Sequence, residues 1–141
     1  PNDAVIALEK FNFSVIQVNF NMIDQRALDN GLFNLAKENN TGIIIRTPLV
    51  FGYLSSKLNG KEKFENNDHR SNWPKEQLKI WAEAPNLFKQ YGLYDSRSPV
   101  QLAIMFCLSF DGVTTVIPGM MNVEHVKENV VSITNKSLSK D

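Results

Sequence analysis

An uninterrupted apolar run, Ile43-Ile44-Ile45, constrains the fold of this chain more than any other feature of its sequence. A strand that faces water on one side alternates apolar and polar residues, but this run is apolar and β-branched throughout. It follows Asn39-Asn40-Thr41-Gly42, a sequence typical of a helix end. The run therefore predicts a short strand covered on both faces, as in the parallel sheet of an α/β protein.

Two more β-rich runs, at residues 15–20 and 113–117, lie before and after this one. Strands that alternate with helices predict parallel pairing through right-handed crossovers. We therefore expect a single α/β domain over residues 1–141, with three parallel strands. The helical patterns occupy residues 4–10, the apolar stripe of Leu28, Leu32, Leu35 and Ala36, residues 75–81 and 86–91, residues 98–109, and residues 122–133.

Residues 47–73 lack such a pattern, and we expect them to form a long loop. The segment holds Gly52, Gly60 and many charged residues, and loops of this length in compact domains are usually functional or mobile. Within it, Asp68-His69-Arg70 has the residue types of a catalytic dyad. In a polar loop, helix capping and a salt bridge are the more typical role for such residues.

Three parallel strands form a sheet with two unpaired edges, and such edges pair readily with other strands. The organisation therefore predicts a missing part or a partner. The chain begins with Pro1-Asn2-Asp3-Ala4 rather than with methionine, so we expect either a processed protein or a fragment of a longer one.

Charge and composition narrow the classes of function. The 15 basic and 15 acidic residues cancel, so we expect no nucleic acid held by bulk charge. No apolar run reaches the length of a membrane span and no signal-peptide pattern is present, so we expect no membrane partner and a cytoplasmic location. The single cysteine, Cys107, lies in an apolar stretch, where a buried packing role is expected. We predict no metal site, because no cluster of His and Cys surrounds it.

Ligands of parallel α/β sheets bind at the carboxyl ends of the strands. The third run ends in Pro118-Gly119-Met120-Met121, and the helix that follows offers free N–H groups and a dipole that favour a phosphate. His125, Glu128 and Asn129 share one face of that helix, and such a face can hydrogen-bond a purine. The same spacing is more typical of a solvated helix flank, so both interpretations remain open.

Several segments, taken together and in this order, resemble the aldo-keto reductase family over nearly the whole chain. Each motif alone is weak, and their order makes the resemblance specific. The loop motif, Phe64 with Asp68-His69-Arg70, is similar to that of one bacterial branch. The other matching segments are residues 17–21, residues 42–49, Pro99-Val100-Gln101-Leu102-Ala103, residues 116–120 and residues 124–129.

The resemblance implies a (β/α)₈ TIM barrel, of which this chain is about the last three βα units. It also implies an NAD(P)-dependent oxidoreductase that interconverts aldehydes or ketones and alcohols. The implied cofactor-binding residues are Gln17 near the nicotinamide carboxamide, Arg46 beneath the nicotinamide ring, Thr47, Leu49 and Gly52 along the pyrophosphate, Gly119 and Met120 near the adenosine ribose and its phosphate, and His125, Glu128 and Asn129 near the adenine. An ordinary buried amide for Gln17 and a structural salt bridge for Arg46 remain alternatives.

Two departures from the family pattern matter. Relatives that prefer NADP often carry a cation just after the Gly119 position, whereas Met120 and Met121 stand here, so the choice between NADP and NAD stays open. The family's catalytic Asp, Tyr, Lys and His belong to the first half of the barrel, and none of their motifs occurs in this chain. We therefore predict no catalytic residue.

Two classes of function follow from these observations. The first is the C-terminal part of an aldo-keto reductase, which contributes cofactor-binding elements and lacks the catalytic residues. The alternative is a non-catalytic, self-associating partial barrel or a regulatory dinucleotide-binding protein. The expected partners are the dinucleotide cofactor and either the missing N-terminal half or a second copy of the chain.

Overall fold

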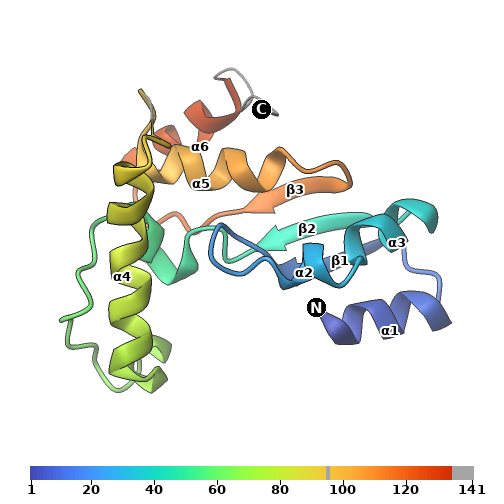
Figure 1. Cartoon of the computed structure of the whole chain (residues 1–141), viewed down its shortest axis with the longest axis horizontal. Helices are drawn as coiled ribbons and strands as arrows, with labels where there is room; N and C mark the ends of the chain where they lie inside the picture. The colour runs from blue at the N-terminus through green and yellow to red at the C-terminus, as the bar shows by residue number, and fades with distance from the viewer. Residues whose placement is uncertain (95, 135–141) are drawn as a thin grey trace.

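The computed structural model describes residues 1–94 and 96–134. Its centre is a sheet of three parallel strands in the order β1 (Val15–Asn19), β2 (Gly42–Arg46) and β3 (Val113–Ile117). The predicted α/β class and the parallel pairing are confirmed. In Figure 1 the arrowheads of β2 and β3 point toward α4 (Lys75–Gln90), which stands across the carboxyl end of the sheet.

The other helices follow the strands in the predicted order. They are α1 (Asn2–Lys10), α2 (Arg26–Asp29), α3 (Leu32–Glu38), α5 (Pro99–Leu108) and α6 (Val123–Thr134), with two short 3₁₀ helices, η1 (Val50–Ser55) and η2 (His69–Asn72). The start of α5 matches its prediction closely, because Ser98 and Gln101 form a capping box and Pro99 occupies the first turn.

One face of the sheet is covered by helices and carries the main core. Val18, Ile43 and Ile45 are buried there together with residues of α1, α3 and α5. Phe20, which follows β1, is fully buried and packs its ring against Phe33. This core fixes the direction of the strands and therefore the position of their carboxyl ends.

The opposite face of the sheet is largely bare. Side chains alternate between faces along a strand, and Val15, Gln17 and Ile117 on this face are exposed. Ile44 is half-buried between buried Ile43 and Ile45. The predicted coverage of both faces was therefore wrong for the described residues, because helices pack on one face only.

Two helical predictions needed correction. The apolar stripe from Leu28 to Ala36 is not one helix, because Gly31 adopts a left-handed backbone with φ of 76° and separates α2 from α3. The two patterns at residues 75–81 and 86–91 form one helix, α4, which continues through Pro85. Residues 47–73 lack an α-helix and a strand, as expected of a long loop, but they contain η1 and η2.

Candidate functional site

A pocket of about 620 Å³ opens at the carboxyl ends of β1 and β2. Asn19 and Arg46, which are paired in the sheet register, line it together with Thr47 and with Arg26 of α2. The other lining residues belong to the segment after β1, to α2, to η1, to Trp73 and to α4. The pocket thus lies where ligands of parallel sheets bind, and it contains two of the predicted cofactor residues, Arg46 and Thr47.

The polar part of the lining is held together by Asn21, which is buried just beyond β1. Its Nδ2 donates to the Thr47 carbonyl at 3.1 Å, and its Oδ1 accepts from the backbone N–H groups of Ile23 and Asp24 at 3.0 and 2.8 Å. The Thr47 hydroxyl lies 3.2 Å from Asn19 Oδ1. One amide side chain therefore joins the ends of two strands and fixes the turn after β2.

That turn has an uncommon backbone. Thr47, Val50 and Phe51 have φ of 58°, 48° and 55°, and Gly52 has φ of 98°. Non-glycine residues rarely adopt this region, β-branched residues least of all, and such conformations gather at ligand-binding sites. The predicted pyrophosphate segment, Thr47 to Gly52 with half-buried Leu49, is therefore a strained turn.

The other wall of the pocket is aromatic, and sequence reasoning missed it. Phe51, Trp73 and Trp81 line it, with ring centroids 5.6 Å apart for Phe51 and Trp73 and 4.9 Å apart for Trp73 and Trp81. Trp81 is buried, whereas Trp73 is 39% exposed. The sequence offered only a weak signal for this wall. Trp73 lies at the end of a polar loop, and Trp81 lies in the second turn of α4.

The Asp68-His69-Arg70 segment forms the start of η2, with Asp68 as its N-cap. Asp68 caps η2 by accepting from Arg70 N at 2.9 Å, and it also pairs with the Arg70 guanidinium. The side-chain hydrogen bond from Arg70, aided by the backbone bond, lowers the pKa of Asp68 to about 2. Arg70 also lies 4.3 Å from the centroid of the Phe64 ring. These contacts favour the capping and salt-bridge interpretation over a catalytic dyad.

Gln17 and Arg46 both lie on the bare face of the sheet. Gln17 on β1 is exposed, so it is not an ordinary buried amide. Arg46 is also exposed and, within residues 1–94 and 96–134, makes no ion pair. Neither alternative role therefore finds support among the described residues.

The remaining predicted residues lie beyond β3. The sheet pairs Arg46 with Ile117, so the chain leaves β2 and β3 at the same edge. Gly119 and Met120 are exposed there, and no atom lies within 4 Å of a Cβ placed on Gly119. Asn122 Oδ1 accepts from His125 N at 2.8 Å. This side-chain bond orders the start of α6.

In the predicted adenine face, Glu128 contacts the start of α5 and Asn129 is buried. Glu128 Oε1 accepts from the Ser98 hydroxyl at 2.7 Å. Asn129 is 8% exposed, and its Nδ2 has no hydrogen-bond partner among the described residues. A buried donor without a partner is unfavourable. The burial of Asn129 and the bond between Glu128 and Ser98 distinguish this face from a solvated helix flank.

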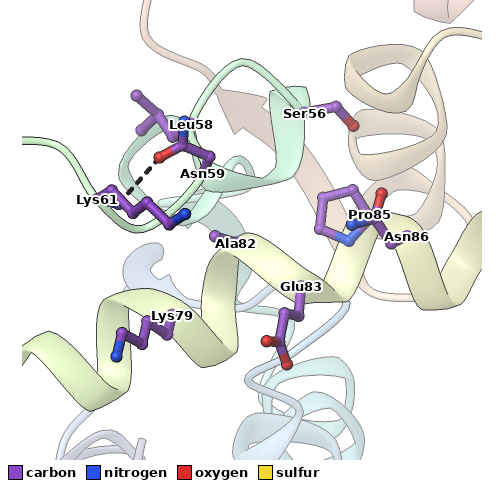
Figure 2. A pocket seen from close by; sticks show the side chains of 9 residues that line it. All are labelled: Ser56, Leu58, Asn59, Lys61, Lys79, Ala82, Glu83, Pro85 and Asn86. Atoms are coloured by element: carbon purple, nitrogen blue, oxygen red, sulfur yellow. Dashed lines mark hydrogen bonds between the residues drawn. The ribbon is translucent and has the colours of Figure 1, made fainter.

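A second hollow, of about 410 Å³, lies between the loop after η1 and the outer side of α4. Figure 2 shows Lys61 on the loop, and Lys79, Ala82, Glu83 and Pro85 along α4. None of the predicted site residues lines this hollow. It lies apart from the strand ends, and we do not assign the site to it.

The comparisons with known proteins fit this geometry. A model of the Aldo/keto reductase family matches residues 4–141. The chain belongs to this family. Two curated relatives of this aldo/keto reductase chain are L-glyceraldehyde 3-phosphate reductases of Escherichia coli, from strains K12 and O157:H7, at 28% and 27% identity over 136 residues.

Solved structures of the family resemble this chain along almost its full length. An aldo-keto reductase from Bacillus halodurans in its holo form is 25% identical, with a TM-score of 0.67. A glycerol dehydrogenase from Gluconobacter oxydans is 22% identical, with a TM-score of 0.77. Each match covers 99% of this chain but only 43% and 42% of the solved chains, and the E. coli matches cover 92% of this chain and 39% of the relatives. This chain thus spans about two fifths of the length of its relatives.

The described residues exclude two further features. None of their helices is long and apolar enough to cross a membrane. They also contain no group of three or more His, Cys, Asp or Glu side chains arranged for a metal ion.

Proposed function

We propose that this chain is the C-terminal part of a (β/α)₈ barrel, its last three βα units, within an NAD(P)-dependent oxidoreductase. The complete barrel interconverts aldehydes or ketones and alcohols, and residues 1–141 form one structural unit of it. Support comes from the family membership, from the span of two fifths of the relatives, and from the bare sheet face. A TIM barrel buries that face against its other strands.

The observation that carries the proposal is the meeting of two turns at one edge of the sheet, the turn after β2 and the turn before α6. The pairing of Arg46 with Ile117 brings the strained turn after β2 beside the turn that leads into α6. Backbone N–H groups of such turns and helix starts are suited to a pyrophosphate. When bound, the dinucleotide supplies the hydride, and the residues of this chain hold and orient it.

Each predicted residue has a place along such a dinucleotide. In our proposal Gln17 and Arg46 meet the nicotinamide end, and Thr47, Leu49 and Gly52 follow the pyrophosphate. Gly119 and Met120 meet the adenosine ribose, and His125, Glu128 and Asn129 meet the adenine. Met120 and Met121 are exposed and uncharged, so they do not indicate a site for the 2′-phosphate that distinguishes NADP from NAD. The proposed cofactor is therefore NADP or NAD. We assign no catalytic residue within the 141 residues.

We expect any affinity of the chain for the cofactor to reside at the adenosine end, because those residues need only the last βα unit. Replacing Glu128 or Asn129 by alanine removes a hydrogen bond to the base, and we expect each change to weaken binding about tenfold. Titration calorimetry with AMP and with adenosine 2′,5′-bisphosphate measures this, and the ratio of the two affinities reports the NADP preference.

Glu124→Ala provides the matched control, because Glu124 is an exposed acidic residue in the first turn of the same helix. It should leave the affinity almost unchanged. Equal affinities for AMP in the wild type, Glu128→Ala and Asn129→Ala would show that the assigned face is wrong.

The bare face also favours the alternative, a partial barrel that self-associates. Val15 and Ile117 are about half exposed on the sheet, and Val123, Val126 and Val130 form an exposed stripe on α6. Leaving one such side chain in water rather than burying it forgoes about 1.5–3 kcal/mol. Several together rival a typical net stability of about 5–15 kcal/mol.

We therefore expect that the 141-residue chain, studied alone, is not a monomer at micromolar concentration. A second copy covering the bare face is the default, because closed symmetric dimers are the commonest assemblies. Sedimentation measures the mass directly. A well-folded species near 16.0 kDa would show that the chain tolerates its bare face, and the self-association would then be excluded.

A further inference from the structure

The hydroxyl group of Ser98 performs two tasks. As the N-cap of α5, its Oγ accepts from Gln101 N at 3.2 Å, and Gln101 Oε1 accepts from Ser98 N at 3.1 Å. Because the cap uses only a lone pair of the oxygen, the hydroxyl proton is free for another acceptor. That acceptor is Glu128 Oε1, 2.7 Å away on α6 and 30 residues later in the chain.

The hydrogen bond from Ser98 fixes the side chain of Glu128. A glutamate side chain has three rotatable bonds, and its carboxylate otherwise samples several rotamers on a helix surface. Helices α5 and α6 pack side by side (Figure 1), and the capping box holds Ser98 rigidly on α5. Hydrogen bonds to a charged group are among the stronger ones in proteins. The carboxylate therefore has one held oxygen, Oε1, and a second oxygen, Oε2, for a ligand.

We infer that Ser98 is a positioning residue that orients Glu128 to accept from the exocyclic amino group of adenine, and so sets the preference for adenine over hypoxanthine. The inference rests on the proposed placement of the adenosine end. Adenine presents an amino donor at position 6, whereas hypoxanthine presents a carbonyl oxygen, which a fixed carboxylate repels.

The two tasks of Ser98 are separable by substitution. Aspartate is about as good an N-cap as serine, but its carboxylate has no proton to donate and repels Glu128. Glycine at the same position costs the helix little and also lacks the hydroxyl. Threonine keeps both the cap and the donor. A role limited to capping predicts little change for all three variants.

The experiment measures the affinities of the 141-residue chain for AMP and IMP by titration calorimetry, with circular dichroism to verify folding. The variants are Ser98→Asp, Ser98→Gly, Ser98→Thr and Glu128→Gln. We expect the wild type and Ser98→Thr to prefer AMP. We expect Ser98→Asp and Ser98→Gly to lose about tenfold of that preference, the usual worth of one hydrogen bond to a charged group.

The outcomes separate this inference from the proposed function. If Ser98→Asp and Ser98→Gly keep the wild-type ratio of affinities while Glu128→Gln loses it, the role of Ser98 is refuted and the adenine assignment stands. If Glu128→Gln also keeps the ratio, or if the wild type does not distinguish AMP from IMP, the adenine assignment itself fails. Loss of the preference in both Ser98 variants with rescue by Ser98→Thr supports the inference.

Discussion

The purified 141-residue chain should oxidise NADPH in the presence of an aldehyde at no measurable rate. A carbonyl reductase of this family needs a proton donor at the substrate oxygen, and loss of a general acid typically costs about 10²–10⁴-fold in rate. None of the three tyrosines is placed for that task. Tyr53 is fully buried, and burial raises its pKa; Tyr91 is 78% exposed on the far end of α4; and Tyr94 donates to the Pro85 carbonyl at 2.9 Å.

The measurement is the absorbance of NADPH over time with L-glyceraldehyde 3-phosphate as substrate. The E. coli L-glyceraldehyde 3-phosphate reductase serves as the positive control for the assay. Turnover that rises in proportion to the concentration of the pure chain, and that follows it through successive purification steps, would contradict the expectation. The chain would then contain a proton donor that we have not assigned.

Phe20→Ala should lower the free energy of unfolding by about 3–5 kcal/mol, the usual cost of emptying a fully buried phenylalanine site. The Phe20 ring is 0% exposed, and its centroid lies 4.9 Å from that of Phe33, 5.5 Å from Phe106 and 5.0 Å from Phe110. It therefore joins the end of β1 to α3 and α5. A loss of this size is a large part of the about 5–15 kcal/mol that stabilises a typical domain.

Urea denaturation followed by circular dichroism measures the loss. Phe11→Ala is the matched control, because Phe11 is 62% exposed, and we expect a change within about 0.5 kcal/mol. A loss of less than about 1 kcal/mol for Phe20→Ala would mean that the aromatic cluster repacks to fill the space. The cluster would then not be the element that fixes the carboxyl end of β1.

The sequence determined the architecture of this chain because its strongest signals are local. The β-branched runs become β1, β2 and β3 within one residue of their expected bounds, and the alternation with helices predicts their parallel pairing. The Ser98 cap begins α5 as predicted. Each of these features depends on neighbours a few residues apart, which are present in the unfolded chain as well.

Only part of the candidate site could be predicted from the sequence. The positions of Arg46, Thr47 and Gly119 at strand ends follow from the strand bounds, and the structure brings Arg46 and Thr47 into one pocket. The aromatic wall of Phe51, Trp73 and Trp81 was not predicted, because its members lie up to 30 residues apart in a segment without periodicity. Only the packing of α4 against η1 brings them together.

Tertiary structure alone decided which side of each element faces the core. The sequence alone does not decide which of Ile16 and Gln17, or which of Ile44 and Ile45, points toward the helices. In the structure Gln17 and Ile44 lie on the bare face, because the helices cover the face that carries Ile16 and Ile45. Likewise, the spacing of residues 125, 128 and 129 shows that they share a helix face, but only the packing of α6 on α5 places Glu128 within reach of Ser98. Periodicity fixes which residues point the same way, whereas the direction itself depends on contacts between segments far apart in the chain.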